Sequence, residues 1–209
     1  MDASDYTAAR RQLHVIAEWL LAGPQHAASG TIRLEAGDGT IATVADPPIS
    51  VTAAGLSYDG STWPLRGTVR QLGTSAGLAC ERPDVIYHDA VPGDCSTTLD
   101  ASVEAFEAVL AVYDVGAEAL DSFSSETPIL WPEHFDLSVR TSNVNFGVSP
   151  GDESSALPYA YVGPDAVDDS PFWNAPFGAQ LLIDPASPDC VAAIVAFFEQ
   201  GLTAATGPR

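Results

Sequence analysis

The chain has 209 residues, and its 28 acidic residues against 8 basic ones, all of them arginine, give a formal net charge of −20. Nucleic acids and anionic membranes are bound by clustered basic residues, so this balance argues against both as partners. Hydrophobic residues make up 46% of the chain and charged residues 17%, which is typical of a globular protein with one large domain or two small ones.

The N-terminal segment predicts an amphipathic helix from about Tyr6 to Leu21, which Gly23-Pro24 should end. Its polar start does not resemble a signal peptide, and no apolar run in the chain approaches the roughly 18 residues of a membrane span. His14 lies on this helix away from the apolar stripe, so we expect its side chain to be exposed to solvent.

Alternating polar and apolar residues follow, and they predict a meander of strands in which Gly37-Asp38-Gly39 forms the first turn. The expected strands of this meander are residues 31–35, 40–44, 49–58 and 66–72. The stretch 73–96 is rich in Gly, Pro, Asp and Cys, and we interpret it as the connection to the second half of the chain.

The second half predicts two more helices, one from about Leu99 to Phe123 and one that begins at Ser187-Pro188-Asp189. Between them, the expected strands are residues 135–139, 144–148, 158–162 and 180–183. The order helix, strands, helix, strands, helix predicts an α+β fold, with mostly antiparallel sheet and three main helices packed on one face. We expect either a single domain, 1–209, or two helix-plus-meander halves, 1–95 and 96–209.

The three cysteines, Cys80, Cys95 and Cys190, include no C-x-x-C pair. An odd and sparse set of cysteines is typical of thiols that are kept reduced, so we expect free thiols and a cytoplasmic protein. The alternative is a disulfide between Cys80 and Cys95, which both lie in loop-like sequence.

Residues 147–151 match the G-x-S-x-G pattern of serine hydrolases around Ser149. That site needs a backbone N–H after the serine, and the next residue here is Pro150, which has none. We therefore expect that Ser149 is not a nucleophile.

Residues 129–149 predict a hairpin that turns at Ser142-Asn143 and pairs Arg140 with Asn145. The apolar residues of its two arms should face the core: Phe135, Leu137, Val139, Val144, Phe146 and Val148. The opposite face should carry His134, Asp136, Arg140 and Asn145. Water alone could explain such a polar face, because antiparallel sheets are often solvated on one side.

Aromatic residues in the following segments favour a binding site on this face. Tyr159 and Tyr161 share one side of a later strand, and Trp173 and Asn174 lie in the long loop 163–178. The predicted ligand-binding residues are His134, Asp136, Arg140, Asn145, Tyr159, Tyr161, Trp173 and Asn174. Arg140 is the only internal arginine in a half with 17 acids, so we expect it to meet a carboxylate, that of Asp136 or of a ligand.

The preferred function is binding of a small molecule, with no metal involved. One alternative is an enzyme in which His134 acts as acid–base, Asp136 is its neighbour, and Arg140 holds an anionic substrate. Another is a divalent-metal site of His134 and Asp136 with Glu133 or Asp152. The last is an oligomerisation surface, as in a homodimer.

Six strings together resemble an uncharacterised family of actinobacterial proteins. They are LAGPQ at 21–25, SGTIRL at 29–34, WPEHFD at 131–136, NFGVSPGD at 145–152, PYAYVGP at 158–164 and FWNAPFGA at 172–179. A looser similarity links the chain to larger actinobacterial domains of unknown function. The resemblance implies a cytosolic bacterial protein and assigns no catalytic residues.

Overall fold

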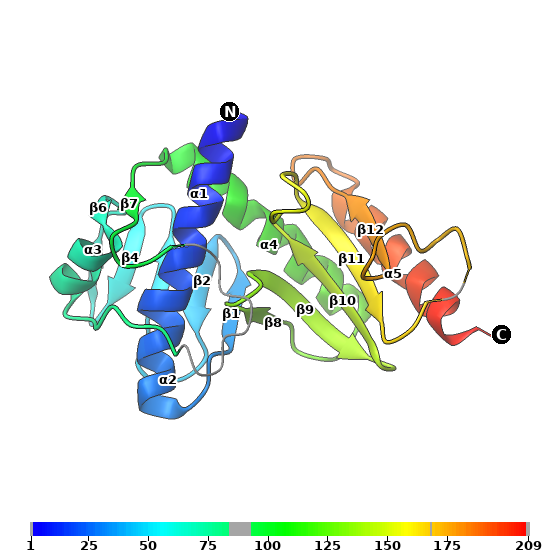
Figure 1. The fold of residues 1–209 in the computed structure, drawn as a ribbon, viewed down its shortest axis with the longest axis horizontal. Coiled ribbons are helices and arrows are strands. Elements are labelled where there is room, and N and C mark those ends of the chain that lie inside the picture. Colours follow the sequence, from blue (N-terminus) through cyan, green and yellow to red (C-terminus); the bar gives the residue numbers. More distant parts are fainter. Residues whose placement is uncertain (1, 84–92, 168, 208–209) are drawn as a thin grey trace.

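The computed structural model describes residues 2–83, 93–167 and 169–207 (Figure 1). Its helices are α1 (Ala3–Ile16), the π-helix η1 (Ala17–Ala22), α2 (Gly23–Ser29), α3 (Val69–Ala76), α4 (Val103–Phe123) and α5 (Cys190–Thr206). Its strands are β1 (Leu34–Gly37), β2 (Thr40–Thr43), β3 (Ser50–Thr52), β4 (Gly55–Tyr58), β5 (Ser61–Trp63), β6 (Gly67–Thr68), β7 (Thr98–Leu99), β8 (Ile129–Trp131), β9 (Asp136–Thr141), β10 (Val144–Ser149), β11 (Tyr159–Pro164) and β12 (Ala179–Leu182). Helices are combined with antiparallel strands, as the predicted α+β class requires.

Ten strands form one antiparallel sheet in the order β12-β11-β10-β9-β8-β1-β2-β3-β4-β5. The strands of the first half and those of the second half meet where β1 pairs with β8, through Leu34 and Leu130. A second, small sheet consists of β6 and β7. The two predicted meanders therefore share one sheet.

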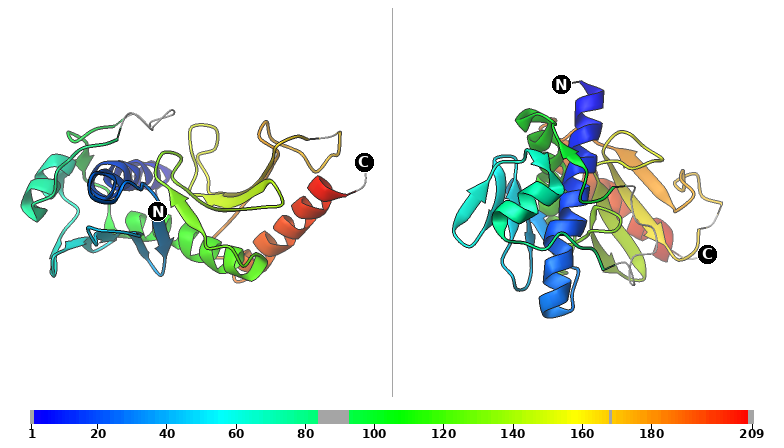
Figure 2. Two further views of the ribbon diagram at one scale, coloured as in Figure 1. Left: turned by 90° about the horizontal axis from the view of Figure 1, so that it is seen from below. Right: turned by 60° about the vertical axis from the view of Figure 1, so that its left-hand side comes forward.

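One face of the large sheet carries the hydrophobic core. Residues that are directly paired on neighbouring strands point to the same face of a sheet. Leu34 and Leu130 are paired and both are buried, so the buried face of the first-half strands continues into that of the second-half strands. In Figure 1, α1 lies in front of the first-half strands, whereas α4 lies behind β9 and β10, and Figure 2 shows the same exchange from below. The sheet thus turns over between its ends, which fits the roughly 20° of twist that each neighbouring pair of strands adds.

The predicted order of three helices is wrong, because a further helix, α3, lies where a strand was expected at 66–72. Thr68 and Gln71 form a reciprocal capping box at its start. Gly77 ends it in the left-handed conformation, with φ +72°. These caps stabilise a helical turn in a segment whose apolar residues also fit a strand.

The first helix does not end at Gly23-Pro24 as predicted. The helical path passes through η1 and continues as α2. Pro24 lies in the first turn of α2, where the N–H group that proline lacks is not required. The end comes at Gly30, which has φ +75°. The second predicted helix begins later than expected, at Val103, because Ser102 accepts the N–H of Ala105 as a cap.

His14 is buried, which contradicts its expected exposure. Its Nε2 lies 2.7 Å from the carbonyl oxygen of Pro132, and its ring stacks on Phe135 with the centroids 4.7 Å apart. Glu18, one helical turn further on, lies 3.8 Å from the same nitrogen. The polar side of α1 is buried because the β8–β9 turn packs against it.

The expectation of three free thiols is also wrong. Cys80 and Cys95 form a disulfide, and Cys190 is free and buried. The backbone of Cys95 also accepts the N–H of Arg70, which fixes its loop against α3. Disulfides persist in oxidising surroundings, so the cysteines no longer support the cytoplasmic location that was inferred from them.

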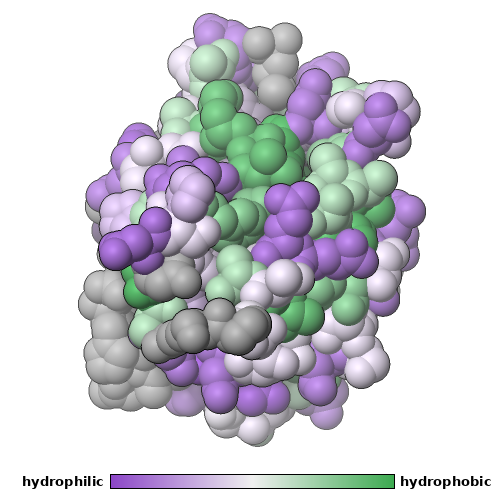
Figure 3. Space-filling view, turned by 90° about the vertical axis from the view of Figure 1, so that its right-hand side faces the viewer, coloured by the Kyte–Doolittle hydropathy of each residue, from purple (hydrophilic) through white to green (hydrophobic). Residues whose placement is uncertain are grey.

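The sheet ends at two edge strands, β12 and β5. Figure 3 shows the end of the molecule next to β12 and α5, where hydrophobic side chains gather between hydrophilic ones. Leu182 on β12 is exposed, and such edges are where chains pair, so a homodimer stays a prediction. Of the helices in the described ranges, none combines the length and the apolar character needed to cross a bilayer.

Candidate functional site

The face of β8 to β11 that points away from α4 and α5 holds the candidate site. The β9–β10 hairpin turns at Ser142 and Asn143, both with positive φ, and pairs Arg140 with Asn145 as predicted. All six apolar residues that were expected to face the core are buried. The polar residues of the strands consequently share the opposite face.

Two adjoining hollows lie on this face, with volumes of about 630 Å³ and 560 Å³. They share Glu133, His134, Asp136, Asn145 and Tyr161. The larger hollow also includes Tyr159, and the smaller one includes Arg140. The structure thus brings together six of the eight predicted residues.

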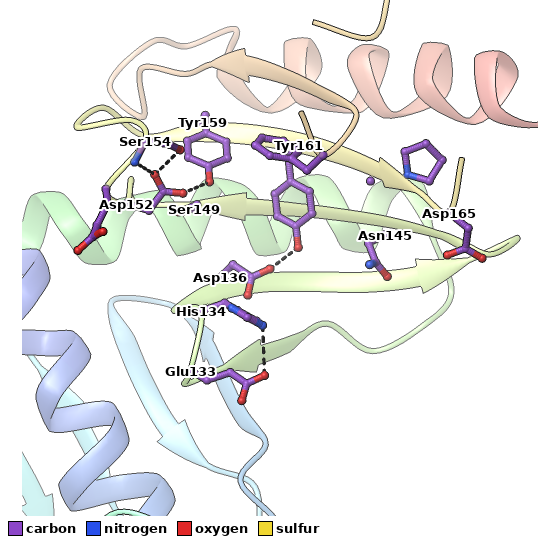
Figure 4. Close-up of a pocket in the computed structure, with 14 residues that line it drawn as sticks. Glu133, His134, Asp136, Asn145, Ser149, Asp152, Ser154, Tyr159, Tyr161 and Asp165 are labelled. Atoms are coloured by element: carbon purple, nitrogen blue, oxygen red, sulfur yellow. Dashed lines mark hydrogen bonds and ion pairs between the residues drawn. The ribbon is translucent and has the colours of Figure 1, made fainter. Parts of the chain in front are cut away.

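Asp136 and Tyr161 form the floor of both hollows. The Tyr161 hydroxyl donates a hydrogen bond to Oδ2 of Asp136 (Figure 4). The other carboxyl oxygen, Oδ1, is buried and has no hydrogen-bond partner among the described residues. Asp136 is only 8% exposed, and this burial raises the pKa of its carboxyl above the usual range, although the hydrogen bond from Tyr161 acts in the opposite direction.

Gly147 makes this contact possible. It lies on β10 between Ser138 and Tyr161, and the Tyr161 ring crosses it to reach β9. A Cβ at this position would lie 2.7 Å from two atoms of that ring and 2.7 Å from the carbonyl oxygen of Leu137. A glycine inside a strand is a sequence signal for such a close approach, and Gly147 is the signal by which the sequence could have indicated this contact.

We expect Gly147→Ala to lower the free energy of unfolding by about 1–3 kcal/mol, because the new methyl group must displace the Tyr161 ring. Urea denaturation measures the change. Gly163→Ala is the matched control, since a Cβ there has its nearest neighbour at 3.6 Å and φ is not positive. Equal stability of the two variants would contradict this role of Gly147.

His134 does not lie on a strand beside Asp136, as predicted, but in the turn between β8 and β9. Phe135 has φ +54° there, and its N–H binds the carbonyl oxygen of Trp131. This turn buries the Phe135 ring between His14 and Tyr113. His134 still faces the hollows, where its Nε2 lies 3.1 Å from a carboxyl oxygen of Glu133.

Tyr159 is held by Asp152, from the loop after β10. Its hydroxyl donates to Oδ2 of Asp152 over 2.5 Å, while Ser154 and Ser155 donate to Oδ1. Burial alone would raise the pKa of Asp152, but these hydrogen bonds outweigh it and lower that pKa. Burial and the Asp152 bond together raise the pKa of Tyr159, so its hydroxyl stays protonated.

Arg140 meets a different carboxylate of the chain from Asp136, which was one of the two expected. Its Nη2 lies 2.9 Å from Asp165, which follows β11, and its Nη1 donates to Oδ1 of Asn145 over 3.0 Å. Both members of the Arg140–Asp165 pair are largely exposed, so the pair contributes little stability. It closes one rim of the site.

Trp173 and Asn174 line neither hollow. Trp173 packs on Phe172, which contacts Phe197 of α5, and the Asn174 side chain binds the backbone of Gln180 twice. The loop does cover the tyrosines, but with a different aromatic residue, Phe177.

Asp152, which the sequence suggested only as a possible metal ligand, also lines the larger hollow. Most of the lining residues that the sequence did not indicate lie in loops, where no periodic pattern shows the direction of a side chain: Glu153, Ser154, Asp165 and Phe177. Gly163 and Pro164, at the end of β11, line it too. Ser149 also lines the larger hollow, and its hydroxyl accepts the N–H of Gly151 in a loop with no following helix. The expectation that Ser149 is no nucleophile stays a prediction.

Comparison with known proteins adds no function to this geometry. No protein-family model, no curated protein and no solved structure matches the chain. The resemblance to actinobacterial proteins therefore stays a prediction, and the case for a function depends on the site itself.

Proposed function

We propose that the chain binds a small organic molecule on the open face of β8 to β11. The observation that carries this proposal is the carboxyl of Asp136, which lines the hollow and whose Oδ1 is a buried acceptor without a described partner. An unsatisfied buried oxygen costs about 1–3 kcal/mol, and a ligand that donates to it would remove this cost. The aromatic wall beside it, Tyr159, Tyr161 and Phe177, supplies apolar contact for the rest of a ligand.

A variant that fills the hollow tests this proposal. Asn145 is exposed and lines both hollows, and tryptophan is well tolerated in strands, so Asn145→Trp should occupy the space. Ser61→Trp, at an exposed position on edge strand β5, is the control. Ligand-detected NMR with a library of anionic, neutral and cationic aromatic fragments should find binders that Ser61→Trp keeps and Asn145→Trp loses. The proposal fails if no fragment binds the wild type, or if Asn145→Trp keeps every binder.

The contact between Glu133 and His134 favours one second function, acid–base catalysis on the same face. A carboxylate 3.1 Å from the imidazole can orient the ring for proton transfer. The expected substrate anchor, Arg140, is paired with Asp165, so an anionic substrate is no longer favoured. If the chain is an enzyme, mass spectrometry should show that the wild type converts a fragment found in the screen and that His134→Gln does not. The affinity of His134→Gln for that fragment should stay within about twofold of the wild type.

A further inference from the structure

We infer that the ligand of this site is an organic cation, an amine or related ammonium compound with an apolar body. This inference rests on the proposed function and names the chemical class that the same hollow takes. Four features of the site support it: its charge, the pairing of its basic groups, its aromatic wall and the unsatisfied oxygen of Asp136.

The larger hollow is strongly acidic. Among its described lining residues, five carry carboxyl groups and the only basic side chain is that of His134. The carboxyl groups belong to Glu133, Asp136, Asp152, Glu153 and Asp165. A cleft that carries one sign of charge focuses its field and concentrates ligands of the opposite sign. An anionic ligand would instead be repelled.

The basic groups His134 and Arg140 each lie beside one of these carboxyl groups, so they offset at most Glu133 and Asp165. His134 lies 3.1 Å from Glu133, and Arg140 lies 2.9 Å from Asp165. Asp152 and Glu153 form no ion pair with a described residue, although Arg10 lies close enough to Asp152 to interact with it electrostatically. The site is therefore suited to supply acceptors rather than donors.

The aromatic wall suits the apolar body of such a ligand. The rings of Tyr159, Tyr161 and Phe177 contact one another, with centroid separations of 6.2 to 6.4 Å. Aromatic faces attract cations as well as apolar groups, and amines bind to sites that combine rings with carboxylates. A ligand whose phenyl or alkyl group packs on this wall has its charged amine within the acidic part of the hollow.

Asp136 is the independent observation that points to a ligand. Figure 4 shows its carboxyl between Tyr161 and His134, with one oxygen on the Tyr161 hydroxyl and the other turned toward the His134 side. That second oxygen, Oδ1, is the buried atom without a described partner. An ammonium group beside it would donate a hydrogen bond and offset the cost that burial imposes on the charged carboxylate.

An organic cation fits better than a metal ion because the carboxyl groups do not converge. Asp152 is occupied by Tyr159 and Ser154, whereas Asp136 lies on the strand below. Within the described residues, no three His, Cys, Asp or Glu side chains are placed to hold one ion. An organic cation, unlike a metal ion, does not need several converging ligands: the negative field of the hollow, the aromatic rings and one or two hydrogen-bond acceptors are enough to bind it.

Three probes of nearly equal shape separate charge from shape: phenethylamine, 2-phenylethanol and phenylacetate. We expect titration by NMR to show phenethylamine bound about tenfold more tightly than the alcohol, and phenylacetate bound more weakly than either. Asp136→Asn should weaken phenethylamine about tenfold and leave the alcohol unchanged. Asp59→Asn, which removes one exposed carboxylate in the β4–β5 turn, is the matched control and should change neither.

The outcomes separate this inference from the proposed function. If the alcohol or phenylacetate binds as tightly as the amine, or if Asp136→Asn has no effect on the amine, the ligand is not a cation held by Asp136. If other fragments bind the wild type and are lost in Asn145→Trp while phenethylamine does not bind, the site stands and its cationic ligand class is wrong. If no fragment binds the wild type, or if Asn145→Trp keeps every binder, the proposed function itself fails.

Discussion

Between pH 7 and pH 5, the free energy of unfolding should fall by about 2 kcal/mol through His14 alone. His14 is only 6% exposed, and burial lowers the pKa of its imidazole from 6.5 to about 3, although the hydrogen bond to Pro132 acts in the opposite direction. Arg10, Arg82 and His134 also disfavour its protonated form.

The sign of this effect follows from the two pKa values. Below pH 6.5 the unfolded chain binds a proton at His14 that the folded chain does not, so the contribution is fully present above pH 6.5. It is lost progressively as the pH falls toward 3.

His14→Gln isolates this contribution, because glutamine does not titrate and its amide can still donate to Pro132. Urea denaturation at pH 7, 6 and 5 should show a loss of stability that is about 2 kcal/mol larger in the wild type than in the variant. Parallel pH profiles for the two proteins would show that His14 is not buried in its neutral form.

Reduction of the Cys80–Cys95 disulfide should lower the free energy of unfolding by about 3 kcal/mol. The two cysteines are 15 residues apart, and closing a loop of that length restricts the unfolded chain by about this amount. Urea denaturation with and without a reductant measures the difference. A variant with both cysteines replaced by serine is the control and should not respond to the reductant.

Thiol labelling of the unfolded, unreduced protein gives an independent measurement. One thiol, that of Cys190, should react before reduction and three after it. Three reactive thiols before reduction would contradict the disulfide and would restore the expectation of reduced cysteines.

The β9–β10 hairpin could be predicted from sequence because two independent patterns agree there. Strict alternation fixes which residues face the core, and a two-residue turn at Ser142-Asn143 then fixes the register. Since the register places Asp136, Arg140 and Asn145 on one face, this much of the candidate site followed from local pattern alone.

Other features depend on contacts between distant segments, which no local pattern contains. The polar side of α1 is buried because the turn before Phe135 packs on His14. The pairing of Cys80 with Cys95 depends on how α3 and its loop fold together. Asp165 and Phe177 lie in irregular segments, so their direction into the site could not be read from periodicity.

A crystal structure of the protein soaked with phenethylamine tests the central claim most directly. The account predicts the ammonium group within hydrogen-bond distance of Oδ1 of Asp136, and the phenyl ring against Tyr159, Tyr161 and Phe177. Phenethylamine bound only elsewhere, for instance in the apolar groove of about 590 Å³ between α1 and Leu157, would contradict it. So would an unliganded open face in crystals in which that face is free of neighbouring molecules.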